Sequence, residues 1–94
     1  MTTISQPPSH IVVYATPYCG DTRRARRVLD ELQMPYEFVD IRQDPQAARL
    51  VEEINQGYRS SPTIVFPDGS VLVEPSDGAL RAKLQGLLTT GTDI

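Results

Sequence analysis

The sequence predicts an α/β fold: a four-stranded mixed sheet flanked by three helices, in the order β-α-β-α-β-β-α. Two observations carry this prediction. Apolar runs rich in β-branched and aromatic residues, typical of buried strands, alternate over the first half of the chain with segments of helical periodicity. A Pro-Asp-Gly turn signal at 67–69 then separates two further apolar runs, and a leucine-rich segment follows. The alternation favours a right-handed parallel unit, and the hairpin makes the sheet mixed, with helices on both faces.

The first strand is expected at 11–14, where the run Ile-Val-Val-Tyr is bounded by turn-forming residues. The segment after it has an apolar helix face at spacings i, i+3, i+4 and i+7, formed by Ala25, Val28, Leu29 and Leu32. Because proline cannot continue a helix, this first helix should end near Met34-Pro35.

Strand composition returns at 36–41, which supplies the second strand. Asp44-Pro45 is a helix cap followed by a first-turn proline. The amphipathic helix that begins there should stop at Gln56-Gly57. Its apolar face is formed by Ala47, Leu50, Val51 and Ile54.

The hairpin strands are expected at 63–66 and 71–73, with 11–14 and 63–66 at the centre of the sheet. Ser76 is the expected N-cap of the last helix. The buried face of that helix should be formed by Leu80, Leu84, Leu87 and Leu88.

The length of 94 residues indicates one domain, which we place at 10–89, with flexible tails at 1–9 and 90–94. A single cysteine cannot form an internal disulfide and favours a reducing compartment, most simply the cytoplasm. The net charge of -3 argues against nucleic-acid binding, and no apolar stretch is long enough for a membrane span. With His10 as the only histidine, we expect no metal site within the chain, which should be a monomer.

The only cysteine, Cys19, lies where the chain turns out of the first strand and into the first helix. The first N–H groups of a helix lack backbone partners and lower the pKa of a nearby cysteine thiol from its free value of about 8.5. Asp21 opposes this effect, since a nearby carboxylate disfavours a second negative charge. Most lone cysteines are buried small hydrophobes, but the flanking Pro17 and Gly20 are loop and cap residues. The sequence therefore favours a reactive thiol.

Several motifs in the stretch from Ile11 to Leu88 resemble the glutaredoxin family of the thioredoxin fold. They are Tyr14 at the end of the first strand, Cys19 five residues later, Arg59 before Ser61-Pro62, Asp68-Gly69, and Pro75-Ser76-Asp77. The Asn-x-Gly-x-Arg-x-x-Pro-Thr run at 55–63 and the Pro-Ser start of the last helix are most similar to the mycoredoxin branch of actinobacteria. The resemblance implies a thioredoxin fold and thiol–disulfide exchange at Cys19.

Two positions depart from the family pattern. The family's redox motif is Cys-x-x-Cys, or Cys-Gly-Phe-Ser in its monothiol class, whereas this chain has Cys-Gly-Asp-Thr at 19–22. Thr22 therefore stands where a resolving thiol would be. The residue before the key proline is usually apolar in these relatives, and here it is Ser61.

The resemblance also implies a cis peptide bond at Ser61-Pro62, whose backbone groups would pair with a bound thiol peptide or substrate. The alternative is a trans proline that opens an edge strand. By the same analogy, Tyr18 and Arg59 flank the binding groove, with ordinary surface contacts as the alternative.

Four more residues are candidates for the site. The Thr22 hydroxyl, three residues after Cys19, should lie above the sulfur and donate a hydrogen bond to it, or else cap the helix locally. Arg23, one turn from Cys19, adds positive potential or is simply solvated. Ser76 and Asp77 could present helix N–H groups to a carboxylate or sugar of the small thiol, with ordinary capping as the alternative.

Arg24, Arg26 and Arg27 continue the cationic cluster along the first helix. We expect them to form a solvated face. Asp30 and Glu31, at i+4 from Arg26 and Arg27, should neutralise it in part.

The leading functional prediction is a monothiol oxidoreductase that reduces mixed disulfides between proteins and a low-molecular-weight thiol, glutathione or mycothiol. One cysteine is enough for this chemistry. A second hypothesis is an iron–sulfur carrier, in which two chains each give Cys19 and two small thiols complete the ligand set of a [2Fe–2S] cluster. A third is a non-catalytic thioredoxin-fold interaction module.

Overall fold

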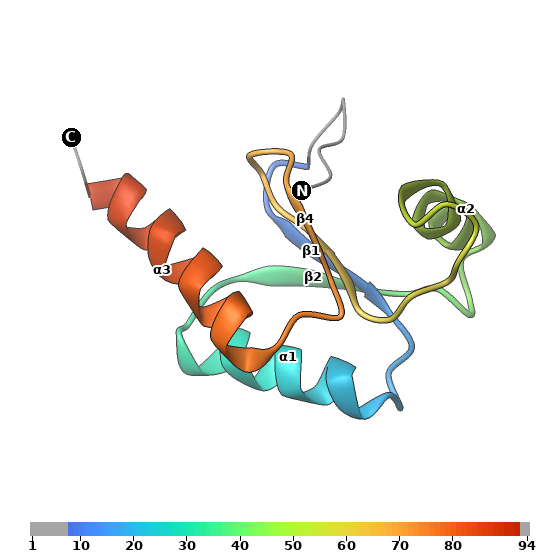
Figure 1. Ribbon diagram of the computed structural model, residues 1–94, viewed down its shortest axis with the longest axis horizontal. Helices are drawn as coiled ribbons and strands as arrows, with labels where there is room; N and C mark the ends of the chain where they lie inside the picture. Colours follow the sequence, from blue (N-terminus) through green and yellow to red (C-terminus); the bar gives the residue numbers. More distant parts are fainter. Residues whose placement is uncertain (1–7, 93–94) are drawn as a thin grey trace.

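The computed structural model describes residues 8–92, which form a four-stranded sheet and three helices in the predicted order (Figure 1). The strands are β1 (Ile11–Ala15), β2 (Tyr36–Asp40), β3 (Thr63–Val65) and β4 (Val71–Val73). The helices are α1 (Gly20–Glu31), α2 (Pro45–Ile54) and α3 (Asp77–Thr92). The predicted α/β architecture is confirmed.

The strands are arranged in the order β2-β1-β3-β4, so the two strands predicted to be central are central. β1 pairs with β2 in parallel and with β3 in antiparallel orientation, and β3 pairs antiparallel with β4. Val13, for example, lies between Phe38 and Ile64. This register brings the end of β1, which leads to Cys19, beside the start of β3, which Ser61-Pro62 precedes.

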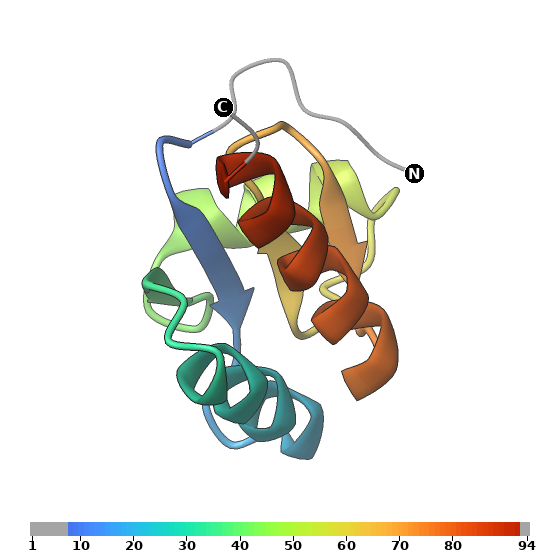
Figure 2. The same cartoon turned by 90° about the vertical axis from the view of Figure 1, so that its left-hand side faces the viewer.

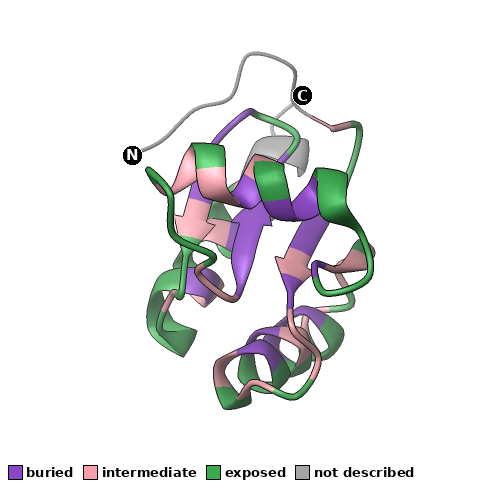
Figure 3. Cartoon of the chain, turned by 90° about the vertical axis from the view of Figure 1, so that its right-hand side faces the viewer, coloured by how far each residue is buried: buried purple, intermediate pink, exposed green. Residues whose placement is uncertain are grey.

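Helices cover both faces of the sheet. α1 and α3 lie together on one face, in front of the sheet in Figure 2, and α2 lies on the other, in front of the sheet in Figure 3. The larger core cluster joins the inward side chains of β1 and β3 to α1 and α3, with Val13, Leu29 and Leu84 fully buried. A smaller cluster under α2 is centred on Val51 and includes Tyr14 from β1. The alternation along β1 therefore separates the two cores.

The first helix ends earlier than predicted, at Glu31 rather than near Met34-Pro35. Gln33 adopts a left-handed backbone with φ 55°, and the N–H of Met34 bonds the carbonyl of Leu29 at 2.9 Å. This is a Schellman motif, which usually has glycine at the left-handed position. Because glutamine rather than glycine occupies this position, the residue pattern does not mark the earlier end of the helix, and the prediction at Met34-Pro35 is three residues too late.

The second helix ends in the same way. Gln56 has φ 57°, and the N–H of Gly57 bonds the carbonyl of Glu52. The helix ends at Ile54, and Gln56 and Gly57 form the turn that terminates it. The predicted stop at Gln56-Gly57 is therefore confirmed.

Other boundaries moved by one to three residues. β1 includes Ala15, β2 stops at Asp40 and β3 at Val65, where the chain enters turns. α3 continues to Thr92, so residues 90–92 belong to the helix rather than to the predicted tail, and 93–94 and 1–7 lie outside the described residues. Within 8–92, no helix combines the length and apolarity needed to cross a lipid bilayer.

Candidate active site around Cys19

Cys19 is the N-cap of α1, at the strand-to-helix turn that the sequence predicted. Its backbone is extended, with φ -72° and ψ 134°, and its carbonyl accepts the first helical bond from the N–H of Arg23 at 3.1 Å. The side chain makes no capping bond to the helix. The thiol is partly exposed and points to the carbonyl oxygen of Ser61, 3.8 Å from Sγ. The start of α1 therefore leaves its orphan N–H groups free beside the sulfur.

The peptide bond Ser61-Pro62 is cis, as the family resemblance implied. It joins the loop after α2 to β3, and it faces the Cys19 loop. Pro62 is buried, and its carbonyl accepts a bond of 2.8 Å from the N–H of Glu74, just before α3. The loop that faces the sulfur is thus anchored from both sides.

The Ser61 hydroxyl is the centre of a small polar network. It accepts a hydrogen bond of 3.0 Å from the backbone N–H of Thr16 and lies 3.1 Å from Thr22 Oγ1 and 3.4 Å from Thr16 Oγ1. Thr22 is fully buried. The sequence placed the Thr22 hydroxyl against the sulfur, but its hydrogen-bond partner in the structure is Ser61 Oγ. Thr22 thereby ties the first turn of α1 to the cis-proline loop.

Asp21, which the sequence set against an ionised sulfur, forms an ion pair with Arg24 one turn along α1. The negative charge of Asp21 is therefore balanced by Arg24. Arg24, which was expected to be part of a solvated cationic face, is instead half of an ion pair. Arg23, the arginine nearest to Cys19 in the helix, has no ion-pair partner among residues 8–92.

The two acidic residues near the end of α1 do not pair as predicted. Arg26 lies over β2: its Nε donates to the Tyr36 hydroxyl at 3.0 Å, and its guanidinium is 4.3 Å from the centre of the Phe38 ring. Glu31 bonds Arg81 of α3 at 2.5 Å instead of Arg27. The expectation that Asp30 and Glu31 neutralise Arg26 and Arg27 is therefore wrong, because partners on β2 and α3 lie within reach.

Tyr18, next to the cysteine, is exposed and stacks against Arg42, whose guanidinium is 4.8 Å from the ring centre. Arg42 is held in turn by two bonds to the carboxylate of Asp40, at 3.1 and 2.9 Å. These bonds lower the pKa of the Asp40 carboxyl and raise that of Arg42. Neither Asp40 nor Arg42 was predicted from the sequence as part of the site. The available signal was their place at the carboxyl end of β2, where open α/β sheets collect functional groups.

Two other predicted residues, Arg59 and Ser76, have structural partners away from the sulfur, and a third, Asp77, lies at the start of α3. Arg59 pairs with Glu52 of α2 at 2.8 Å. The Ser76 hydroxyl accepts the N–H of Ala79 at 3.1 Å, which is the ordinary capping considered as its alternative, and Asp77 lies in the first turn of α3. Among residues 8–92 no hydrogen bond or ion pair links any of these three to Cys19.

Asn55 orders the chain ahead of the cis-proline loop. Its amide donates to the carbonyl of Val51 at 3.0 Å and to the hydroxyl of Thr63 at 3.1 Å. The Thr63 hydroxyl donates to the carbonyl of Ser60 at 2.9 Å and is fully buried. The Asn55–Thr63 motif of the sequence thus has a positional role. It holds both ends of the loop that carries Ser61.

This arrangement suits nucleophilic sulfur chemistry. A thiolate at Cys19 would meet the unpaired N–H groups of α1 on one side and the cis-proline backbone on the other, and a substrate disulfide could approach between them. No cluster of three or more metal-ligating side chains occurs in the part of the chain that the structure describes.

Comparison with known families decides what kind of protein this is. The Glutaredoxin family model matches residues 11–72, from the start of β1 into β4. The chain belongs to the glutaredoxin family. It is a thiol–disulfide oxidoreductase of that family, as the motifs around Cys19 indicated.

Curated relatives agree with this assignment. A glutaredoxin of Mycobacterium tuberculosis is 38% identical over 74 residues, which cover 79% of this chain and 88% of that protein. Mycoredoxin 1 of Corynebacterium glutamicum is 32% identical over 79 residues, covering 84% of this chain and 98% of the relative. The resemblance to the mycoredoxin branch is confirmed.

Solved structures confirm the thioredoxin-like fold. The crystal structure of a mutant thioredoxin-like protein superposes with a TM-score of 0.67 at 32% identity, covering 87% of this glutaredoxin and 97% of that chain. The solution structure of a glutaredoxin from Brucella melitensis gives a TM-score of 0.64 at 24% identity, covering 95% and 100% of the two chains.

Proposed function

We propose that this glutaredoxin works by a monothiol mechanism and reduces mixed disulfides between proteins and a low-molecular-weight thiol. The observation that carries the proposal is the pairing of Cys19, the only cysteine, with a hydroxyl residue at the resolving position. Thr22 is buried and hydrogen-bonded to Ser61. A hydroxyl cannot displace a thiol from a mixed disulfide, so the second step needs a second small thiol.

The exchange takes place in two steps at sulfur. First, the Cys19 thiolate attacks the small-thiol sulfur of the substrate, which forms a Cys19–small-thiol disulfide and releases the protein thiolate, protonated by solvent. Second, the thiolate of another small-thiol molecule attacks the small-thiol sulfur on Cys19. This returns the Cys19 thiolate and yields the oxidised dimer of the small thiol, so the sum of the two steps consumes one free small thiol for each protein thiol released.

The proposed partners are S-thiolated proteins and either glutathione or mycothiol, with the protein acting as a monomer in the cytoplasm. The similarity to mycoredoxin 1 supports testing the mycothiol substrate first. Tyr18 and Arg23, on either side of the sulfur along the chain, are the proposed contacts for the small thiol. Arg59, Ser76 and Asp77 have a weaker case because their side chains or backbone have structural roles already.

The test compares turnover of a small-thiol mixed disulfide with reduction of a two-cysteine protein disulfide. Native protein should turn over the mixed disulfide and reduce the protein disulfide at least about tenfold more slowly, because it has no resolving thiol. Cys19→Ser should lose both reactions. Thr22→Cys should gain the second, since residues i and i+3 at a helix start bring their side chains together.

The matched control for Thr22→Cys is Glu53→Cys, which adds an exposed thiol on α2, across the sheet from α1. It should leave the protein disulfide unreduced. Equal turnover by Cys19→Ser and native protein would contradict the mechanism. So would native reduction of the protein disulfide as fast as that of the mixed disulfide.

A further inference from the structure

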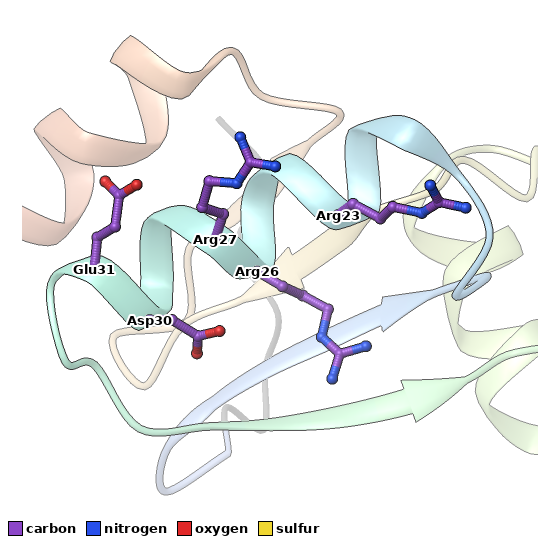
Figure 4. A pocket seen from close by; sticks show the side chains of 5 residues that line it. All are labelled: Arg23, Arg26, Arg27, Asp30 and Glu31. Atoms are coloured by element: carbon purple, nitrogen blue, oxygen red, sulfur yellow. The ribbon is translucent and has the colours of Figure 1, made fainter.

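The outer face of α1 carries a depression of about 590 Å³, and of its lining residues only Arg23 is a proposed contact for the small thiol. Figure 4 shows its lining: three arginines and two acidic residues projecting from successive turns of the helix. They are Arg23, Arg26, Arg27, Asp30 and Glu31. Four of the nine cationic side chains of the protein lie within residues 23–27, although the whole chain is acidic. Positive charge is thus concentrated on one helix.

The charges on this face are not cancelled within it. Arg26 is held in place by its hydrogen bond to the Tyr36 hydroxyl, a neutral partner. Glu31 is engaged by Arg81 of α3 at 2.5 Å. Neither Arg23 nor Arg27 has an ion-pair partner among residues 8–92. The surface therefore offers an excess of guanidinium groups, with Asp30 as its one acidic side chain outside an ion pair in that described part of the chain.

The two unpaired arginines are aligned with the reactive cysteine. Arg23 and Arg27 follow the N-cap Cys19 by four and eight residues, and their i, i+4 spacing places the two arginines on one stripe of the helix that leads away from Cys19. At a rise of about 1.5 Å per residue, the arginines begin about 6 and 12 Å from the cysteine along the helix axis. An extended chain advances about 3.3 Å per residue. Side chains two to four residues from a substrate cysteine at Cys19 would then face Arg23 and Arg27.

We propose that this stripe docks an acidic segment of the protein substrate, with Asp or Glu about two to four residues from the S-thiolated cysteine. The proposal rests on the monothiol function above and names the class of protein on which it acts. Guanidinium groups bind carboxylates through charge-assisted hydrogen bonds, and an exposed cationic surface also speeds the encounter. A protein partner is favoured over nucleic acid because the chain as a whole carries a net charge of -3.

The experiment uses three peptides that each carry one S-thiolated cysteine and differ only at the third residue after it: Asp, Ser or Lys. At low salt, kcat/KM of native protein should be about three- to tenfold higher for the Asp peptide than for the Ser peptide, and lower still for the Lys peptide. The preference should shrink as salt is raised to about 0.3 M, because exposed charges are screened.

The deciding variant is Arg27→Glu, which should reverse the order of the Asp and Lys peptides. Arg49→Glu, an equal charge change at an exposed position of α2, is the matched control and should keep the native order. If Arg27→Glu keeps the native order, or if native protein treats the three peptides alike while turning them over, the docking surface is refuted and the monothiol function stands. If native protein turns over none of the S-thiolated peptides, the monothiol function itself fails.

Discussion

The two helices that follow the parallel strands both begin at the carboxyl edge of the sheet, but their N-cap side chains differ. α1 begins after β1 and α2 after β2, both at the carboxyl edge of the sheet. At α2 the N-cap Asp44 accepts two N–H bonds, from Gln46 and Ala47, each at 3.1 Å. At α1 the N-cap is Cys19, and its side chain accepts none.

This difference separates a structural helix start from a reactive one. A side chain that fills the orphan N–H groups stabilises a helix by about 1 kcal/mol, and α2 has that contribution. α1 goes without it, so its N–H groups stay available to a thiolate or a substrate. Its first turn is held instead by the Thr22–Ser61 contact to the cis-proline loop. A tertiary hydrogen bond has replaced the local cap.

The largest expected effect, on turnover, comes from replacing Cys19 with a residue that caps α1. Cys19→Ser should abolish turnover, yet raise the free energy of unfolding by about 0.5–1 kcal/mol, because serine is a strong N-cap. Denaturant titration of both proteins measures the second effect. A less stable variant would show that the α1 start is not an unfilled cap.

The second largest effect is expected from loss of the Thr22–Ser61 hydrogen bond, which holds the first turn of α1 in place of an N-cap. Ser61→Ala removes the partner of the Thr16 N–H and the Thr22 hydroxyl, and should lower the free energy of unfolding by about 1–3 kcal/mol. Turnover should fall as well, because the cis-proline loop loses its tie to α1. Ser60→Ala, one residue earlier, is the control and should change stability by less than about 0.5 kcal/mol. Equal effects of the two variants on stability would show that the hydrogen bonds of the Ser61 hydroxyl do not stabilise the start of α1.

Removing the filled cap should cost stability without touching the chemistry. Asp44→Ala deletes the two bonds at the start of α2 and should lower the free energy of unfolding by about 1 kcal/mol. Asp44→Asn, which can still cap, should retain most of it. Turnover of both variants should stay within about twofold of native. A drop comparable to that of Ser61→Ala would mean that α2, too, serves the active site.

The smallest effect concerns the other end of the sheet, at the turn between β3 and β4. There the bonds from Lys83 and Ser70 lower the pKa of Asp68 to about 2 from its ordinary value of 3.8. The folded protein thus binds this proton less readily than the unfolded chain. The contribution of Asp68 is complete above about pH 5 and is lost as the pH falls through 2.

Because the Asp68 side chain is half exposed, this loss should be only about 0.5 kcal/mol. Denaturant unfolding at pH 6 and pH 3 measures it, and Asp68→Asn should remove this part of the pH dependence. A native pH dependence unchanged in Asp68→Asn would show that the ion pair with Lys83 contributes nothing.

The order and type of every element followed from the sequence because periodicity and turn residues reflect local physics. The apolar run at 11–14 and the Asp44-Pro45 cap needed no tertiary information. The end of α1 did, since a glutamine in left-handed backbone leaves no sign in the sequence. The polar composition of residues 90–92 likewise concealed the last turn of α3.

In the candidate site, too, local features could be predicted and contacts between distant segments could not. Cys19 and the cis-proline loop were found from local motifs and family resemblance. The hydroxyl network was not, because Thr16 and Thr22 are 45 and 39 residues from Ser61 in the chain. The packing of Arg26 against β2 was missed for the same reason. Pairs within one helix can be read from spacing, whereas competition from another element requires the fold.

The two glutamines in left-handed backbone bear on how this protein can be altered. A side chain in that conformation costs about 1 kcal/mol or more relative to glycine, and Gln33 and Gln56 both terminate helices at sites separate from the Cys19 turn. Glycine at either position should therefore add stability, in part offset by the freedom that it gives the unfolded chain. Two stabilising substitutions away from the active site are therefore open to laboratory evolution. Variants with costly changes around the sulfur, such as a new resolving cysteine, could be carried on a background that tolerates them.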